Sequence, residues 1–349
     1  MRVSTPQTTS DPARGLVIGT AIGYGFRDVE PFLTSLRRVG FAGAVILTLA
    51  RGVSAPDLAR FDDHGVTTFV VRGSSWIERS PHTSASAARG VLRATIGRTP
   101  LAARLALTLQ GPISRRWGLY PALAAAFPEL FSVTPWIFLS DTRDVCFQSD
   151  PSGIFTDLCR REPLHLFLEG NPGADARDVT GLAGALTIGD QPDNANWIEF
   201  LGGPAMLQRL KDRQIVCAGT ILLTAPALAA LSPRIVKQLA TPHARSAPGG
   251  LDQGALNVLY HTGALSDLEP SAHANADAGV MTMGACSPGT YAFHNGALLV
   301  GGTRPPVVHQ YDRVPAIRAA WTEPDGQVNA GLPPSDPSTP QVHAPIQIA

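Results

Sequence analysis

The stretch GLVIGTAIG at residues 15–23 begins an alternation of strands and helices that determines the fold class. It is short, apolar, rich in β-branched residues and bounded by glycines, which is typical of a buried strand. Residues 29–39 carry apolar side chains at helical spacing, and residues 44–49, 55–64 and 67–71 resemble a strand, a helix and a strand. This alternation predicts a parallel sheet covered by helices on both faces, with ligands bound beyond the carboxyl ends of its strands.

The rest of the chain extends this pattern more irregularly. The predicted helices cover residues 92–110, 114–130 and 250–260, and the predicted strands cover residues 136–140, 164–168, 215–223 and 306–309. Residues 171–196 are polar and rich in glycine, so they predict a loop. We expect one α/β domain over residues 15–322 with a mixed, mostly parallel sheet and a more irregular C-terminal half. Residues 1–14 predict a flexible N-terminus, and residues 323–349, rich in Pro and Ser, predict a disordered tail.

Composition narrows the class of protein. The chain has 349 residues, of which 44% are hydrophobic, which is enough apolar mass for a large core. Its 28 basic and 28 acidic residues give no positive surplus, which argues against nucleic-acid binding. Four widely spaced cysteines argue against a zinc site or a disulfide scaffold, and no apolar run reaches the length of a membrane helix or a signal peptide. We therefore expect a cytoplasmic enzyme with no integral membrane segment.

The segment FLSDTRDVCFQSDP at residues 138–151 is the strongest chemical signal. A predicted buried strand runs directly into Asp141, Arg143 and Asp144, and Asp150 follows six residues later. Buried charges need a partner, and oxygen ligands of this kind suit Mg²⁺ or Mn²⁺ carrying a phosphorylated substrate. The alternative is structural: Arg143 pairs with one aspartate, and Asp150 caps the following turn.

A strand followed by the motif Asp-x-x-Asp-Val-x-Phe-Gln-x-Asp-Pro resembles the metal-site segment of glycosyltransferases with the GT-A fold. The resemblance is greatest to glycogenin-like and plant arabinosyl/xylosyltransferase-like enzymes. In that family an Asp-x-Asp pair binds a divalent cation. Asp144 matches the second aspartate and keeps the six-residue spacing to Asp150. The position of the first aspartate is Thr142 here, and the acid lies one residue earlier, at Asp141. The resemblance therefore implies Asp144 as a metal ligand, with Asp141 binding the metal, the ribose or Arg143.

Two further segments fit the same resemblance. GGLDQGALN at residues 249–257 resembles a helix start at which an Asp-Gln pair faces the donor sugar, implying catalytic roles for Asp252 and Gln253. A helix-capping role for Asp252 is the alternative. The sequence VVHQYDR resembles the family's C-terminal ending, where a histidine completes the metal site. Of nine histidines, His309 is the one that this resemblance implies as a metal ligand.

Weaker features suggest further site residues. Tyr24 follows the first strand, where it would stack on the nucleotide base, and Gly219 would let the backbone approach the transferred sugar. Arg143 and Arg116 are candidates to contact the diphosphate. Glu169, at the end of the strand LHLFL, is a candidate general base in an inverting reaction.

The resemblance implies a soluble glycosyltransferase that moves a hexose or pentose from a nucleoside-diphosphate sugar to an acceptor hydroxyl with Mn²⁺ or Mg²⁺. Glycogenin-like enzymes retain the configuration at the sugar, with Asp252 or Gln253 facing the reacting carbon, whereas an inverting enzyme would use a base such as Glu169; both outcomes stay open. The acceptor is open among a glycan, a lipid and a small molecule. Two alternatives remain: a catalytically silent relative that binds a nucleotide sugar or glycan, and a metal-dependent phosphatase. The phosphatase is less favoured because that class places Asp-x-Asp on an early strand.

Overall fold

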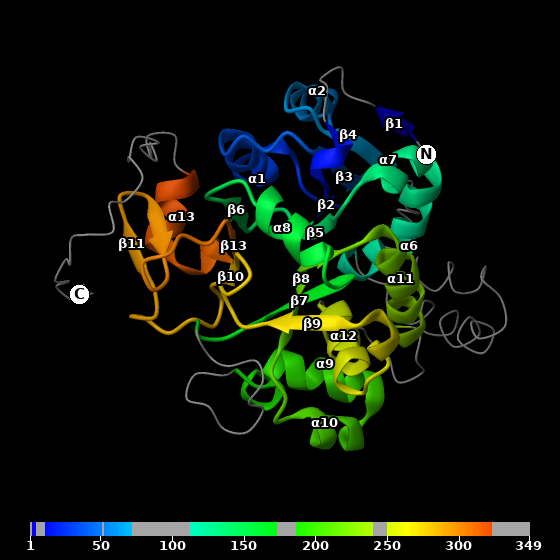
Figure 1. Ribbon diagram of the computed structural model, residues 1–349, viewed down its shortest axis with the longest axis vertical. Coiled ribbons are helices and arrows are strands. Elements are labelled where there is room, and N and C mark those ends of the chain that lie inside the picture. Colours follow the sequence, from blue (N-terminus) through cyan, green and yellow to red (C-terminus); the bar gives the residue numbers. More distant parts are fainter. Residues whose placement is uncertain are drawn as a thin grey trace.

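The computed structural model describes residues 2–4, 11–50, 52–71, 112–172, 186–239 and 250–322. A mixed eight-stranded sheet forms the centre of these residues (Figure 1). Its strands lie in the order β1 (Arg2–Ser4), β4 (Thr67–Val71), β3 (Ala44–Ala50), β2 (Leu16–Ala21), β5 (Ile137–Asp141), β8 (Val216–Leu223), β7 (Leu164–Leu168) and β9 (Pro270–His273).

The sheet confirms the predicted mixed, mostly parallel α/β fold. The strands β4, β3, β2 and β5 run parallel, and β9 runs parallel to β7. The strand β8 runs antiparallel to both of its neighbours, and β1 runs antiparallel to β4. The carboxyl end of β5 therefore lies beside the residues that precede Thr220 in β8, because Ser140 pairs with Thr220. This edge of the sheet carries the candidate site described below.

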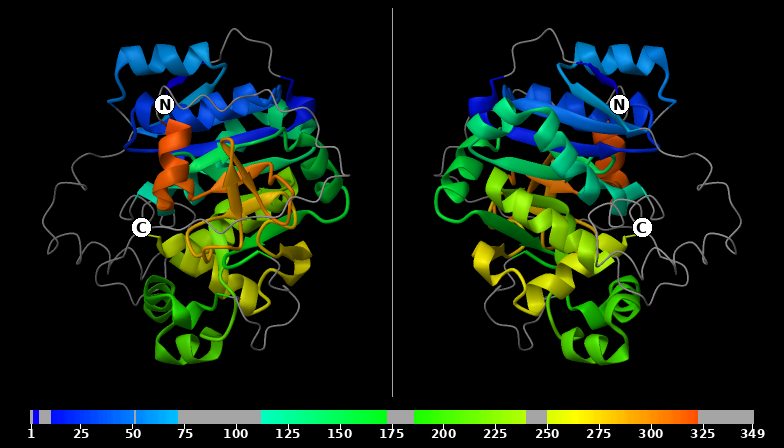
Figure 2. Two further views of the ribbon diagram at one scale, coloured as in Figure 1. Left: turned by 90° about the vertical axis from the view of Figure 1, so that its left-hand side faces the viewer. Right: turned by 90° about the vertical axis from the view of Figure 1, so that its right-hand side faces the viewer.

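Helices cover both faces of the sheet because apolar side chains alternate along its strands. In β2, Leu16 and Ile18 pack into a core with α6, α11 and α12, whereas Val17 packs into a second core with α1, α2 and α8. In both views of Figure 2, α2 (light blue) and α10 (green) lie at opposite ends of the molecule. The described helices are α1 (Phe26–Arg38), α2 (Ala55–Asp63), α6 (Pro112–Ala126), α7 (Pro128–Val133), α8 (Ser152–Cys159), α9 (Pro192–Gly202), α10 (Pro204–Leu210), α11 (Ala225–Leu239), α12 (Leu251–His261) and α13 (Pro315–Thr322), with short 3-10 helices at Pro12–Arg14, Ile188–Asp190, Ser266–Leu268 and Tyr311–Arg313.

The C-terminal part is more irregular, as predicted. The strands β10 (Val280–Thr282), β13 (Val307–His309) and β6 (Val145–Phe147) form a small second sheet, and β11 (Ala292–His294) pairs with β12 (Ala297–Leu299). In Figure 1 these elements lie with α13 on one side of the central sheet. Among the described residues, no helix has both the length and the apolar character needed to cross a membrane.

Three predictions of local structure differ from the structure. The helix predicted over residues 114–130 is divided into α6 and α7, because Pro128 has no amide hydrogen to continue the first helix. The loop predicted over residues 171–196 is wrong where α9 begins at Pro192, a residue that favours the first helical position. Residues 2–4 form a strand, although residues 1–14 were expected to be flexible. The predicted helix at residues 92–110 and the predicted tail at residues 323–349 lie outside the described residues.

Two histidines link the edge strand β9 to β7. Nδ1 of His165 lies 2.9 Å from Nε2 of His273, and the rings are stacked. Nε2 of His165 donates to the carbonyl oxygen of Glu162, so Nδ1 must accept the hydrogen of His273. Burial lowers the pKa of His165, and burial together with His165 and Arg161 lowers the pKa of His273 to about 4. Both rings are therefore neutral in the folded protein near pH 7.

We expect this histidine pair to make stability depend on pH. The unfolded chain binds protons near pH 6.5 and the folded chain near pH 4, so stability falls as pH decreases from 6.5 to 4. For His273 the loss at pH 5 is about 1–2 kcal/mol, discounted for partial exposure. Urea denaturation at pH 7.5 and pH 5 measures the loss in the free energy of unfolding. This loss should be smaller for His273→Gln, which keeps a donor for His165, than for the wild type. Equal losses in both proteins would contradict this assignment.

Candidate active site

Three polar side chains converge where β5, β6 and β13 meet. Asp141 is the last residue of β5, and Asp144 immediately precedes β6. The strand β6 runs antiparallel to β13, with Val145 opposite His309. This register brings His309 next to Asp144, although 165 positions separate them in the sequence. The group lies beyond the carboxyl end of a central strand, where open α/β sheets bind ligands.

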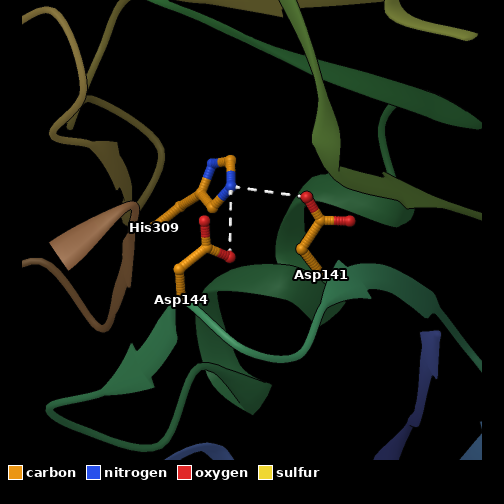
Figure 3. A group of neighbouring side chains, drawn as sticks. All are labelled: Asp141, Asp144 and His309. Carbon is orange, nitrogen blue, oxygen red and sulfur yellow. Dashed lines mark ion pairs between the residues drawn. The ribbon is translucent and has the colours of Figure 1, made fainter. Parts of the chain in front are cut away.

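Nε2 of His309 faces both carboxylates (Figure 3). It lies 3.7 Å from Oδ2 of Asp141 and 3.9 Å from Oδ1 of Asp144. One ligand atom from each residue lies within 4.8 Å of the other two. In an octahedral Mg²⁺ shell, with bonds of about 2.0–2.1 Å, adjacent ligand atoms are about 3 Å apart and opposite ones about 4 Å apart. The two separations from Nε2 fall in this range and the carboxylate oxygens lie within 4.8 Å of each other, so small side-chain movements would let all three residues share one cation.

The surroundings of the imidazole test whether these residues fit a cation. Nε2 of His309 is buried and has no hydrogen-bond partner among the residues that the structure describes, an arrangement that costs about 1–3 kcal/mol unless a ligand satisfies the atom. Nδ1 lies 3.4 Å from both Oγ1 of Thr282 and Sγ of Cys217, which hold the ring with Nε2 toward the carboxylates. Two carboxylates and an imidazole suit Mn²⁺ or Mg²⁺. The residues therefore fit a divalent cation. We call Asp141, Asp144 and His309 the Asp-Asp-His group.

The electrostatics of this group favour positive charge. Burial alone raises the pKa of Asp141, but Arg116 and His309 outweigh it and lower this pKa to about 2. Burial raises the pKa of Asp144 above its usual value. For His309, burial lowers the pKa, but Cys217 and the two carboxylates raise it well above its usual value. The field that holds a proton on the imidazole would also attract a divalent cation.

Gly219 keeps the space beside this group open. It immediately precedes the residues of β8 that pair with β5, and its backbone faces His309 and Asp141. A Cβ atom at this position would lie 2.5 Å from Cε1 of His309 and 2.7 Å from Oδ2 of Asp141. Such separations are far shorter than van der Waals contact, so a side chain here would displace at least one candidate ligand.

Gly219→Ala should therefore weaken Mn²⁺ binding by about tenfold or more, as outer-shell changes at metal sites do. The displaced side chain would be His309 or Asp141, and the rest of the fold would stay intact. Titration of Mn²⁺ followed by electron paramagnetic resonance of the free ion measures this affinity. Gly153→Ala is a matched control, because nothing lies within 4 Å of a Cβ at that helical position. Unchanged Mn²⁺ affinity in Gly219→Ala would show that the group does not bind the ion.

A buried arginine connects Asp252 to the candidate metal group. Nε and Nη2 of Arg116 donate to Oδ2 of Asp252 at 3.0 and 2.7 Å, and Nη1 donates to Oδ1 of Asp141 at 2.7 Å. Nη2 also donates to the carbonyl oxygen of Ala218, and Nε1 of Trp117 donates to Oδ2 of Asp252. Oδ2 of Asp252 thus accepts three hydrogen bonds from this chain. Its partner is a specific buried arginine, which goes beyond a helix-capping role.

Gln253 is also held by neighbouring groups. Its Nε2 donates to Oε1 of Glu169 at 3.2 Å and to Oδ1 of Asn194 at 3.0 Å, and its Oε1 accepts from the amide of Ala218. Both amide hydrogens are therefore committed within the protein. Burial raises the pKa of Glu169. Glu169 lies behind Gln253 and is not among the residues that line the pocket.

A pocket of about 260 Å³ contains most of the predicted site residues, and its volume is near the lower end of the usual range for small-molecule sites. The predicted residues Tyr24, Asp141, Arg143, Asp144, Gly219, Asp252 and Gln253 all line it, whereas His309 borders it behind the two aspartates. Arg116, the other arginine predicted to contact the diphosphate, also lines it, and the remaining lining residues are Thr20, Ile22, Thr142, Trp197, Ala218, Gly250, Gln310 and Arg313.

The structural alternative for the acidic segment was that Asp150 caps a turn and that Arg143 pairs with an aspartate of the segment. The structure agrees with the first part only. Asp150 is exposed, and its Oδ1 accepts hydrogen bonds from the amide and hydroxyl of Ser152, so it caps the start of α8. It does not line the pocket. Arg143 pairs with an aspartate outside the segment, with Nη2 3.2 Å from Oδ2 of Asp312. Asp141 pairs with Arg116 rather than with Arg143.

Four residues of the site were missed in the sequence. Gln310 and Arg313 line the pocket and lie close to His309 along the chain, so proximity to a predicted ligand could have found them. Trp197 lies just beyond the segment predicted to be a loop, and Thr282 carries no motif. Only the packing of α9 and the register of β10 against β13 bring these two residues to the site.

Comparisons with known proteins give one kind of match. No protein-family model and no curated sequence matches the chain. Among solved structures, core-mannan synthase A from Aspergillus fumigatus, in its Mn/GDP form, aligns with 78% of this chain and 74% of its own, at 9% sequence identity and a TM-score of 0.38.

Proposed function

We propose that the protein is a metal-dependent glycosyltransferase that moves a sugar from a nucleoside-diphosphate sugar to an acceptor hydroxyl. The observation that carries this proposal is the Asp-Asp-His group, whose buried imidazole nitrogen has no partner and faces two carboxylates. Asp141, Asp144 and His309 would hold Mn²⁺ or Mg²⁺. A cation there would supply Lewis-acid stabilisation of the negative charge that develops on the departing diphosphate.

The charges of the pocket support a diphosphate ligand. Three arginines and three aspartates line it, so their charges cancel. A divalent cation would leave two positive charges, which complements the charge of a diphosphate diester. Arg143 and Arg313 both pair with Asp312, but 47% and 56% of their side chains are exposed, which leaves donors for phosphate oxygens. We assign this role to them and place the nucleotide base at Tyr24.

We propose positioning roles for Asp252, Gln253 and Glu169. Oδ2 of Asp252 accepts three hydrogen bonds, which makes this oxygen a weak nucleophile, and the contact of Asp252 with Arg116 orients the metal ligand Asp141. Glu169 holds the amide of Gln253. A retaining reaction would then proceed without a covalent intermediate on Asp252. Proton NMR of the sugar released from the donor would measure the anomeric configuration.

The compartment is also a proposal. All four cysteines, Cys146, Cys159, Cys217 and Cys286, are free thiols, and two of them are buried. Unpaired thiols are typical of proteins in a reducing environment. We therefore propose a cytoplasmic location. Thiol trapping in intact cells of the source organism would find these cysteines oxidised if the protein works in an oxidising compartment.

Calorimetric titration with UDP and GDP, with and without Mn²⁺, tests the proposed function. We expect micromolar binding of one nucleotide with Mn²⁺ and at least tenfold weaker binding without it. Hydrolysis of a panel of sugar nucleotides in the absence of acceptor would then identify the donor. Metal-dependent binding without turnover of any sugar nucleotide would indicate a silent binding protein. No metal-dependent binding of either nucleotide would refute the proposal.

A further inference from the structure

Trp197 forms a part of the pocket that the proposed metal and diphosphate roles do not use. It lies on α9 and packs against the start of α12, where two glycines make room for it. A Cβ at Gly250 would lie 2.4 Å from Cζ2 of the indole, and a Cβ at Gly254 would lie 2.7 Å from the Cβ of Trp197. The absence of side chains at both positions lets the indole lie directly on the helix and contribute to the pocket wall.

Within the part of the chain that the structure describes, the polar groups beside Trp197 carry no free charge. Gln253 has both amide hydrogens committed, and the Arg116–Asp252 pair is buried and neutral overall. Arg116 uses its guanidinium on Asp252, Asp141 and the backbone, so it offers little to a ligand anion. The more exposed pocket arginines, Arg143 and Arg313, belong to the β5–β6 turn and to the 3-10 helix after β13.

An aromatic ring beside neutral polar groups matches a particular ligand chemistry. A ring with an apolar C–H face would pack on the indole, and its hydroxyl groups would meet the amide oxygen and backbone of the same wall. Among the described residues of this wall, a carboxylate or phosphate would find no available cation and would lose its hydration without compensation. The wall therefore favours an uncharged sugar over a uronate or a phosphosugar.

We propose that Trp197, Gly250 and Gln253 form a subsite for an uncharged sugar ring, which packs one face on the indole. This assignment rests on the proposed function, since it identifies the sugar that the transferase handles. The ring belongs either to the donor or to the acceptor. Both have the same chemistry at this wall, and the experiment below distinguishes them.

The test compares Trp197→Leu, which keeps an apolar side chain, with Trp197→Phe, which keeps an aromatic one. Dissociation constants in Mn²⁺ are measured for UDP, UDP-glucose and UDP-glucuronate, and for GDP and GDP-mannose. A donor ring on Trp197 predicts about tenfold weaker binding of the neutral sugar nucleotide by Trp197→Leu, with less than twofold change for the nucleoside diphosphate. Trp197→Phe should stay within about threefold of the wild type, and UDP-glucuronate should bind no better than UDP.

The acceptor arm uses methyl glycosides added to the complex of protein, Mn²⁺ and nucleoside diphosphate. If the acceptor ring packs on Trp197, Trp197→Leu loses this glycoside binding and keeps the donor affinity unchanged. Phe200→Leu, on the same helix but outside the pocket, is the control for general disturbance of α9. Melting temperature confirms that each variant folds.

Two results would overturn the subsite while leaving the proposed function intact. The first is wild-type affinity of Trp197→Leu in both arms, and the second is an equal loss for nucleoside diphosphate and sugar nucleotide. Tight binding of UDP-glucuronate that depends on Trp197 would contradict the requirement for an uncharged ring. Absence of metal-dependent nucleotide binding in the wild type would instead refute the transferase itself, and the subsite with it.

Discussion

His309→Ala should weaken Mn²⁺-dependent binding of the nucleoside diphosphate by about 100-fold or more. The substitution removes the one nitrogen ligand of the Asp-Asp-His group, and changes even to outer-shell residues of metal sites cost 10–100-fold in affinity. Asp144→Asn, which keeps the shape of the side chain but loses its charge, should have a similar effect. Calorimetry with the nucleotide that binds the wild type measures the loss, and electron paramagnetic resonance measures Mn²⁺ affinity alone.

Asp150→Asn is the matched control for this prediction. Asp150 belongs to the same acidic segment, but it is exposed and its carboxylate caps α8. Its variant should bind Mn²⁺ and nucleotide as the wild type does. If His309→Ala and Asp144→Asn both behave like Asp150→Asn, the metal site is not where we place it. A loss of Mn²⁺ binding in Asp150→Asn alone would show that Asp150, the third aspartate of the segment, is the metal ligand.

Arg116→Ala should have the largest effect on stability, with a loss of about 3–5 kcal/mol in the free energy of unfolding. Arg116 and Asp252 have only 3% and 2% of their side chains exposed and are joined at 2.7 Å. Removing the arginine leaves a buried carboxylate with only Trp117 as a side-chain donor. Urea denaturation at pH 7.5, with the slope checked for two-state behaviour, measures the change.

Two further variants test whether the stability lost in Arg116→Ala comes from the unpaired buried carboxylate of Asp252. The double variant Arg116→Leu with Asp252→Leu removes both charges and should recover most of the lost stability. Arg234→Ala breaks an ion pair with Asp267, whose side chain is 62% exposed, and should cost no more than about 1 kcal/mol. Similar losses for Arg116→Ala and Arg234→Ala would mean that Asp252 relaxes toward water. Arg116→Ala should also reduce Mn²⁺ affinity, because the guanidinium holds Asp141.

Pattern within single segments predicted most of the fold. The strands from β2 to β5, and β7, β8 and β13, were predicted within two residues at each end, because apolar runs bounded by glycine or polar residues specify buried strands directly. The helix α9 was missed because residues 171–196 are rich in Gly, Asn and Asp, and contacts with α10 and α12 favour its helical form. Propensity in such a segment is a weak guide, and tertiary packing determines its structure.

In the candidate site, too, some residues could be predicted from single segments of the sequence, whereas their contacts could not. Asp141, Asp144, Asp252 and His309 could be named from the sequence, because strand-end acids and a histidine after a strand are visible in single segments. The partners of these residues could not be named. Arg116 meets Asp252 across 136 positions, and His309 meets Asp144 only through the pairing of β6 with β13.

The sequence by itself determined the alternating α/β pattern that begins at residues 15–23, and the residue types that a metal and diphosphate site requires. The tertiary structure alone decided which groups remain available for a ligand. Oδ2 of Asp252 and the side-chain amide of Gln253 have hydrogen-bond partners within the protein, whereas Nε2 of His309 has none among the described residues. Hydrophobic periodicity is local and can be read along a chain, but the satisfaction of a buried polar atom depends on neighbours brought together by strand register and helix packing.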